Sequence, residues 1–274
     1  MNTLIRAELA KQSGRPANWL LLAIAVSLNL TFAYLIPYAG YLGADTAAPN
    51  ANRGLATMLP GAFTANVLGG LPIFVGALIL VFGALVAGSE YSFGTWKTLL
   101  VLEPSRTKLL VAKAITVLIG AIAMILVLAA TAAVASAVIA GITDSGITWP
   151  TLFEMIEALG AATMIAAMWG AFGIFLGIAF QSVALPIGLG LVWMLAIQNL
   201  LAGVAAPLLD AVDKAQHYLP GPNAGSLAAA FGANVDTPGV SAIVSTGHAV
   251  TVVAVYLIAF CAGGALLLKR RDVL

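Results

Sequence analysis

Residues 114–142 read AITVLIGAIAMILVLAATAAVASAVIAGI, a continuous stretch without a charged side chain. A helix needs about 20 mostly apolar residues to cross the hydrocarbon core of a bilayer, which is about 30 Å thick. This stretch is therefore predicted to span a membrane. Five further segments have the same character, at residues 19–36, 67–87, 158–180, 183–204 and 249–268.

The composition of the 274-residue chain agrees with six spans. Hydrophobic residues make up 61% of the sequence and charged residues 8%, whereas soluble proteins carry roughly 25% charged residues. The net charge of +1 provides no basic surface for nucleic acid. The single cysteine, Cys261, excludes a disulfide framework. We predict an all-α polytopic protein in which residues 1–274 form one transmembrane domain.

The distribution of basic residues predicts the orientation of the chain. If both termini are cytoplasmic, most Lys and Arg residues fall on the cytoplasmic side, as the positive-inside rule requires. These residues are Arg6, Lys11, Arg15, Lys97, Arg106, Lys108, Lys113, Lys269, Arg270 and Arg271. Only Arg53 and Lys214 then lie outside. We therefore expect a protein of the cell membrane with both termini in the cytoplasm.

Two of the longer segments between spans are predicted to be external. Residues 39–65 form a loop that contains Asp45, and residues 205–247 form a second segment rich in Pro and Gly. Within the second segment, residues 208–219 have the pattern of a short amphipathic helix, and residues 226–231 that of an apolar helical stub at the membrane edge. The sequence thus predicts broken helices between spans 5 and 6.

The start of the fourth span carries a helix-capping signal. Thr151 is followed three residues later by Glu154, which is the spacing of a capping box. An acidic side chain at this position also suits the positive end of the helix dipole. We predict a structural role for both residues.

The sequence contains no evident means of driving transport by itself. The six predicted spans hold no Asp, Glu, Lys, Arg or His, the residues that usually mark proton or ion pathways. No G-x-x-x-x-G-K-[ST] motif for nucleotide binding occurs. His217 and His248 stand alone, without a second ligand at metal-binding spacing. We therefore expect no cofactor or metal in this chain, and any energy for transport would come from another protein.

Small residues form two stripes, one in the second predicted span at intervals of seven residues and one in the fourth. The residues are Gly69, Gly76 and Gly83 in the second span, and Gly170, Gly173 and Gly177 in the fourth. Each stripe is predicted to lie on nearly one helix face, where small residues allow two backbones to approach closely. The stripes would pack helices within the chain or, alternatively, form a dimer interface.

The least generic segment is the predicted cytoplasmic loop at residues 88–108, which reads GSEYSFGTWKTLLVLEPSRTK. Residues 89–103 are predicted to form a short helix, and Pro104 would end it. The aromatic and aliphatic side chains of this helix would lie at the membrane surface. The segment is either an interfacial anchor or a docking element for a cytoplasmic partner.

This loop also resembles a stretch found in the small permeases of type-2 ATP-binding-cassette (ABC) exporters. The residues that carry the resemblance are Glu90, Gly94, Thr95, Pro104, Ser105, Arg106 and Lys113. Similar permeases include the membrane subunits of bacitracin-resistance, lantibiotic-immunity and sodium-efflux systems. Chain length, six spans, cytoplasmic ends and a broken helix pair before the last span are similar as well.

The resemblance implies a membrane subunit that pairs with a second permease, either another copy or a sister chain, and binds two copies of a separate cytoplasmic ATPase. ATP and magnesium would bind to that ATPase. The loop would be the coupling helix in a groove of the ATPase, and residues 4–11 would form an interfacial helix that also contacts it. The implied coupling residues are Glu90, Phe93, Gly94, Thr95, Trp96, Lys97, Leu100, Pro104 and Arg106.

The sequence thus favours a permease that exports a hydrophobic or amphipathic molecule with energy from a separate ATPase. Two alternatives are kept open: a channel or carrier that works alone, and an intramembrane hydrolase. The charge-free spans argue against the first alternative. Ser241, Ser245 and His248 are close in sequence, but they lack the turn motif of a serine hydrolase.

Overall fold

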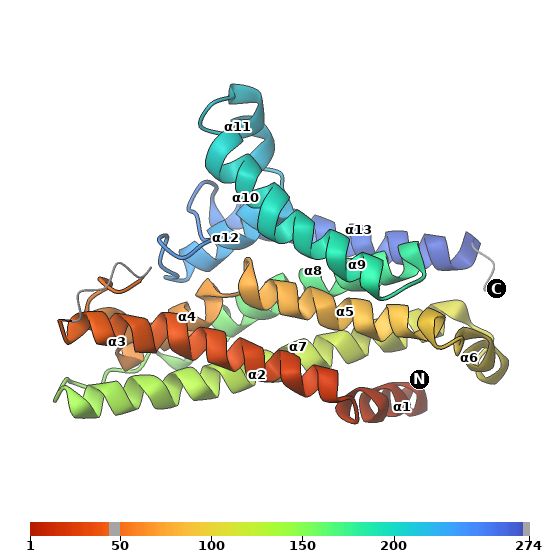
Figure 1. Ribbon diagram of the computed structural model, residues 1–274, viewed down its shortest axis with the longest axis horizontal. Helices are drawn as coiled ribbons and strands as arrows, with labels where there is room; N and C mark the ends of the chain where they lie inside the picture. Colours follow the sequence, from red (N-terminus) through yellow and green to blue (C-terminus); the bar gives the residue numbers. More distant parts are fainter. Residues whose placement is uncertain (44–49, 271–274) are drawn as a thin grey trace.

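The computed structural model describes residues 1–43 and 50–270, which form helices and no strand (Figure 1). Six segments within these ranges are long and apolar enough to cross a membrane, which confirms the all-α class and the number of spans. They are Pro16–Tyr41, Phe74–Ser92 (α5), Arg106–Ile142 (α7), Leu152–Phe180 (α8), Ala184–Ala205 and Thr246–Arg270 (α13). Asp45 and Arg271, which entered the predictions of loop and orientation, lie outside the described residues.

Both described ends of the chain lie at the same end of the bundle, on the right in Figure 1. Helix α1 (Asn2–Ser13), the short helix α6 (Trp96–Leu102) and the last turns of α13 all lie toward this end. We call this the terminal end and the opposite one the far end. An even number of spans returns the chain to the side where it began, and the sequence predicts that this side is cytoplasmic.

The centre of the bundle is the pair of helices α5 and α8, with α7 and α13 packed against α8. Large side chains such as Ile79 and Leu80 of α5 and Trp169 of α8 are fully buried between the helices. The first, fifth and sixth spans, in contrast, are largely exposed although they are strongly apolar. Apolar surface of this extent is typical of contact with lipid or with another membrane chain.

Helix α8 begins with the predicted cap. The Thr151 hydroxyl accepts a hydrogen bond from the Glu154 backbone N–H at 3.3 Å, and the Glu154 carboxylate accepts one from the Thr151 N–H at 2.7 Å. This reciprocal pair is the capping box, so the prediction is confirmed. The helix ends at Gln181, which has a φ of +50°, and α9 (Ala184–Leu191) follows almost at once.

The second span begins later than predicted. Residues 67–87 do not form one helix, because α4 (Phe63–Gly69) and α5 are separated by a break at residues 70–73. Pro72 lies in this break, and proline both lacks a backbone N–H and disfavours the helical conformation in the residue before it. The prediction that Gly69 shares a helix face with the other two glycines of its stripe is therefore wrong. Two 3₁₀ turns, Leu55–Met58 and Pro60–Ala62, precede α4.

The loop after α5 is also divided differently from the prediction. Residues 89–103 are not one helix: α5 continues to Ser92, residues 93–95 form a turn, and α6 follows. Gly94 has a φ of +65°, a conformation that glycine adopts without strain. Pro104 follows the end of α6, as predicted.

Two short helices connect the fifth and sixth spans. Helix α11 (Asp210–Gln216) lies within the predicted amphipathic segment, but α12 (Pro220–Ala230) begins earlier than the predicted stub at residues 226–231. The early start follows from Pro220, because proline is favoured in the first turn of a helix, where no N–H is needed. Helix α12 is mostly buried against α13 and α4, so it belongs to the core at the far end.

The first and fifth spans contain turns of π-helix. The first span consists of α2 (Pro16–Leu30), the π turn η1 (Thr31–Leu35) and α3 (Ile36–Tyr41). The fifth consists of α9, the π turn η4 (Val192–Ile197), α10 (Gln198–Leu200) and the π turn η5 (Leu201–Ala205). Such wide turns are rare and often occur at functional sites.

Candidate functional site: a buried charge cluster

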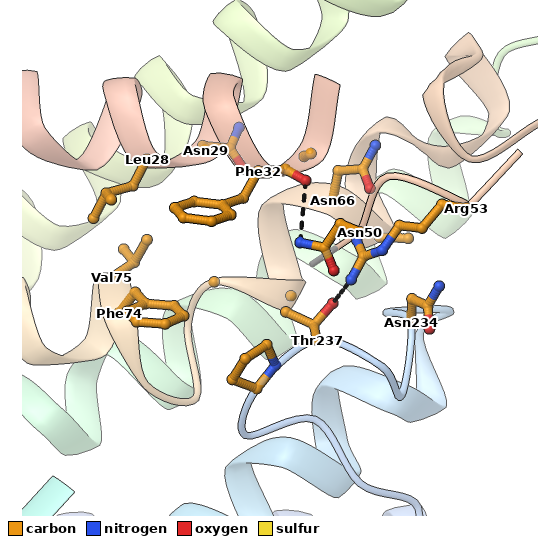
Figure 2. Close-up of a pocket in the computed structure, with 15 residues that line it drawn as sticks. Leu28, Asn29, Phe32, Asn50, Arg53, Asn66, Phe74, Val75, Asn234 and Thr237 are labelled. Atoms are coloured by element: carbon orange, nitrogen blue, oxygen red, sulfur yellow. Dashed lines mark hydrogen bonds between the residues drawn. The ribbon is translucent and has the colours of Figure 1, made fainter. Parts of the chain in front are cut away.

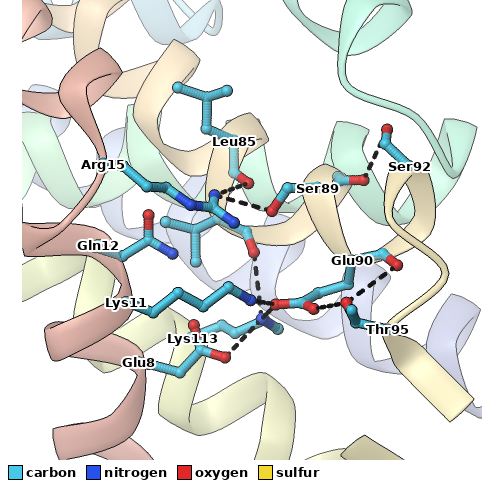
Figure 3. A network of polar contacts seen from close by, with 12 residues as sticks. Glu8, Lys11, Gln12, Arg15, Leu85, Ser89, Glu90, Ser92, Thr95 and Lys113 are labelled. Atoms are coloured by element: carbon cyan, nitrogen blue, oxygen red, sulfur yellow. Dashed lines mark hydrogen bonds and ion pairs between the residues drawn. The ribbon is translucent and has the colours of Figure 1, made fainter. Parts of the chain in front are cut away.

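Four charged side chains from three helices meet at the terminal end (Figure 3). They are Glu8 and Lys11 of α1, Glu90 near the end of α5, and Lys113 in the second turn of α7, and we call them the charge cluster. The Lys113 Nζ lies 2.7 Å from Glu90 Oε1 and 2.9 Å from Glu8 Oε1. Lys11 forms a second ion pair with Glu90. The cluster therefore links the N-terminal helix to two spans.

Glu8, Glu90 and Lys113 are shielded from solvent, whereas the Lys11 side chain is 34% exposed. Glu90 is 0% exposed and Lys113 is 1% exposed. The removal of a charge from water costs several kcal/mol per ion, so such a pair is retained only where its partners are well placed. Lys113 meets this condition, because its ammonium group also donates to the Val86 carbonyl at 3.2 Å and lies 5.6 Å from the centre of the Trp96 ring.

Glu90 also organises the turn that leads into α6. The Thr95 hydroxyl donates a hydrogen bond to Glu90 Oε2, and the Thr95 backbone N–H donates to the Glu90 carbonyl at 2.9 Å. Trp96, the next residue, is buried against Tyr91, with 5.3 Å between the ring centres. One carboxylate thus holds α1 and α7 on one side and the start of α6 on the other.

Arg15 extends the network to the start of the first span. Its Nη1 donates to the Ser89 hydroxyl at 3.0 Å and to the Leu85 carbonyl at 3.4 Å. Ser89 directly precedes Glu90, so two consecutive residues of α5 are fixed by the N-terminal segment. Together these contacts make α1, α5, α7 and the beginning of α6 one connected unit.

The comparison with protein families gives a match over nearly the whole chain. Residues 20–274 match the family described as "Protein of unknown function (DUF2705)". The chain belongs to this family. A search among curated proteins finds no match to the chain. The matched range includes Glu90 and Lys113, whereas Glu8 and Lys11 precede it.

The structure of this DUF2705 member places the predicted coupling residues in two groups. Glu90, Thr95 and Trp96 lie in or against the charge cluster. Phe93, Gly94, Lys97 and Pro104 are exposed around α6, and Leu100 is partly buried. Arg106 lies apart from the cluster, because its Nη1 donates to the Leu268 carbonyl of α13 at 2.8 Å. The burial of Trp96 contradicts the prediction that its side chain packs into a groove of another protein.

Sequence reasoning did not place Glu8, Lys11 and Lys113 in a site with Glu90. Lys113 and Glu90 are 23 residues apart, and Glu8 is 105 residues from Lys113. Each residue alone is typical of the charged flank of a helix, and the opposite signs of the charges are one signal that could pair them. All four lie near predicted span ends on one side of the membrane, and this shared position could have suggested the cluster.

The glycine stripes lie inside the chain. A Cβ atom added to Gly83 would lie 2.3 Å from the Gly170 carbonyl oxygen, and one added to Gly173 would lie 2.1 Å from the Leu80 oxygen. These residues therefore let α5 and α8 meet backbone to backbone. Gly76 faces the Trp169 ring and Gly177 faces Gly88, so they line the same contact between α5 and α8. Gly69 lies apart from this contact, near Thr237.

Proposed function

We propose that this chain is the permease subunit of a type-2 ABC exporter. The observation that carries the proposal is the attachment of α6 to the charge cluster. Thr95 and Trp96 bind the start of this helix to Glu90 and Lys113, while its other face is free. The motif that resembles those of ABC permeases covers the same residues.

The free face of α6, together with Phe93 in the turn before it, supports a partner at this position. Phe93, Val101 and Leu102 are 73%, 82% and 76% exposed, although all three are apolar. A groove in a cytoplasmic ATPase would cover them, and the burial of each large apolar side chain is worth about 1.5–3 kcal/mol. In this proposal the contact residues are Phe93, Val101 and Leu102, and Trp96 supports the helix from inside.

Energy would reach the spans through the cluster. ATP and magnesium bind to two copies of the ATPase, and their closure moves α6. Because the cluster joins α6 to α1, α5 and α7, this movement favours one of two packings of the spans, which is a shift in population. The largely exposed first, fifth and sixth spans provide surface for a second permease subunit, of the same or a sister chain, and for lipid.

The proposed exporter lies in the cell membrane with both termini in the cytoplasm. Its substrate would be a hydrophobic or amphipathic molecule, because the spans that would line a cavity between two subunits are apolar. The chain itself would not bind nucleotide, because its sequence lacks the nucleotide-binding motif.

A co-purification experiment tests the proposal. The ATPase expected from the neighbouring reading frame is expressed with the wild-type chain and with a variant carrying Phe93→Ser, Val101→Ser and Leu102→Ser. The variant should lose the ATPase while it remains in the membrane. The matched control is Leu152→Ser with Phe153→Ser, because these side chains are 73% and 69% exposed at the far end. The control should retain the ATPase.

Vesicle assays separate the alternatives. The wild-type complex should transport only with ATP, and the isolated chain should neither bind nucleotide nor transport. Transport by the isolated chain would instead support a channel or carrier, and peptide cleavage would support a hydrolase. Retention of the ATPase by the α6 variant would show that this helix is only a membrane anchor.

A further inference from the structure

A pocket of about 200 Å³ lies at the far end, between the first span, α4, the start of α5 and the loop after α12. Its lining is divided into two halves (Figure 2). The apolar half consists of Leu28, Phe32, Phe74 and Val75, and the polar half of Asn50, Arg53, Asn234 and Thr237. The two halves come from segments that are far apart in the sequence, so the pocket forms only when the chain is folded.

Two residues that line this pocket carry a hydrogen-bond donor without a partner among the described residues. Asn29 is only 8% exposed and its Nδ2 is unbonded, although it lines the pocket. The Nε of Arg53 is also buried and unbonded, while its Nη2 donates to the Thr237 hydroxyl at 2.6 Å. Buried donors are nearly always satisfied in folded proteins, so two unsatisfied donors on residues that line one pocket favour an acceptor that enters it.

This acceptor should carry a negative charge. Arg53 forms no ion pair within the described part of the chain. The pKa of Arg53 lies below its ordinary value because burial disfavours the charged form, and the nearby Asp236 carboxylate offsets this effect only in part. Water would supply an acceptor for Arg53 but no charge, whereas a carboxylate or phosphate would supply both.

The apolar half indicates what the anion is attached to. The Phe32 and Phe74 rings are stacked, with 6.4 Å between their centres and 3° between their planes. They are also 39% and 38% exposed, so they form the open wall of the pocket on the outside of two spans. The pocket is smaller than the roughly 300–1,000 Å³ of sites that enclose a whole drug-sized ligand. It has room for a headgroup and the beginning of a chain, and the remainder would leave past the two rings.

We propose that this pocket binds the anionic headgroup of a membrane amphiphile, with Arg53 and Asn29 as donors and the hydrocarbon chain against Phe32 and Phe74. The proposal does not depend on the ABC assignment, because it uses only residues of the far end. A phospholipid of the bilayer and a single-chain amphiphile share this chemistry. The Asn50 side chain, which donates to the Phe32 carbonyl at 3.3 Å, fixes the polar half to the π turn of the first span.

Native mass spectrometry of the full chain in maltoside micelles tests the proposal, with decyl phosphate as the probe. We expect one bound copy per chain. Inorganic phosphate and added decyl maltoside, which supply only the anion or only the chain, should not compete at the same concentration. Dioleoyl phosphatidylglycerol, compared with dioleoyl phosphatidylcholine, serves as the bilayer-lipid arm. The site is supported if decyl phosphate binds better than its competitors or if the phosphatidylglycerol binds better than the phosphatidylcholine. The anionic probe that binds more tightly shows whether the natural ligand is a single-chain amphiphile or a bilayer lipid.

The variants locate the site. Arg53→Gln should weaken binding of decyl phosphate about tenfold or more, because a hydrogen bond to a charged group is lost. Asn29→Leu, which removes an uncharged donor, should weaken it about fivefold. Lys214→Gln is the matched control, since it removes an equal charge from an exposed residue of α11 and should leave binding unchanged.

Two outcomes would overturn the proposal. The first is equal binding of decyl phosphate by wild type and Arg53→Gln, and the second is full competition by inorganic phosphate or decyl maltoside. If Arg53→Gln fails to fold, Arg53→Lys preserves the charge and should bind within about threefold of wild type, while Asn29→Leu still reports on the pocket.

Discussion

The two ends of this molecule differ in how their buried charges are paired. At the terminal end, Glu90 and Lys113 are fully buried, and each has several partners of opposite charge or polarity. At the far end, Arg53 is partly buried and lines an open pocket, and within the described residues its side chain donates a hydrogen bond to Thr237 alone. Glu90 and Lys113 thus have partners of opposite charge within the chain, whereas the Arg53 Nε has no partner among the described residues. The difference teaches that burial of charge alone does not identify a binding site, because a buried charge can be balanced by other side chains of the same protein.

The largest effect is expected from Lys113→Met, which tests whether the paired charges at the terminal end are structural. The change preserves most of the side-chain volume but leaves Glu8 and part of Glu90 without a counter-charge in a buried site. Loss of one partner from a buried ion pair typically costs about 3–5 kcal/mol. We expect a loss of this size in the free energy of unfolding, measured with denaturant in micelles.

A second variant separates unpaired charge from lost packing. Adding Glu90→Gln to Lys113→Met removes the uncompensated carboxylate, so the double variant should be more stable than the sum of the two single changes predicts. Strict additivity would mean that the cluster is not a coupled unit.

A smaller effect is expected where the cluster meets α6. Thr95→Val removes the hydroxyl that donates to Glu90 and leaves one carboxylate oxygen unsatisfied. An unsatisfied buried polar group costs about 1–3 kcal/mol. The unfolding free energy should fall by this amount, and proteolysis near α6 should become faster. Thr98→Val is the matched control, because Thr98 is exposed on α6 and its replacement should change the stability by less than about 0.5 kcal/mol.

The smallest effect is expected at the far end. Arg53→Gln removes a charge that forms no ion pair with the described residues, so the lost hydrogen bond to Thr237 is offset by relief of desolvation. We expect the unfolding free energy without ligand to change by no more than about 1 kcal/mol. A loss as large as that of Lys113→Met would mean that Arg53 is structural, and the contrast between the two ends would disappear.

The sequence was sufficient for the coarse fold, because runs of apolar residues encode membrane spans directly. It also predicted the cap of α8, since Thr151 and Glu154 interact across only three residues. It failed at residues 70–73, where Pro72 interrupts a helix that hydropathy treats as continuous. It failed again at Trp96, because an aromatic residue at a membrane surface looks the same in sequence whether it points outward or inward.

The candidate site was predictable only in part for a related reason. Glu90 and Lys113 belong to one local motif, but nothing in it pairs their side chains, and only the packing of α1, α5 and α7 brings them together with Glu8 and Lys11. The far-end pocket had no sequence signal, because Asn29 lies in an apolar run and Arg53 in a loop. Contacts between distant segments cannot be read from periodicity, which reports on one helix at a time.

The length of α7 has a consequence for the surrounding bilayer. Its charge-free part, residues 114–142, extends for about 44 Å at about 1.5 Å per residue, whereas the hydrocarbon core measures about 30 Å. Val134, Val138 and Ile142 are exposed and apolar up to the last turn, so the helix minimises hydrophobic mismatch when it tilts. A thicker bilayer would permit a more upright helix. Lys113 fixes the opposite end of α7 to α1 and α5, so a change in the tilt of α7 would also reorient α6. The length of the acyl chains in the membrane would therefore influence the orientation of α6.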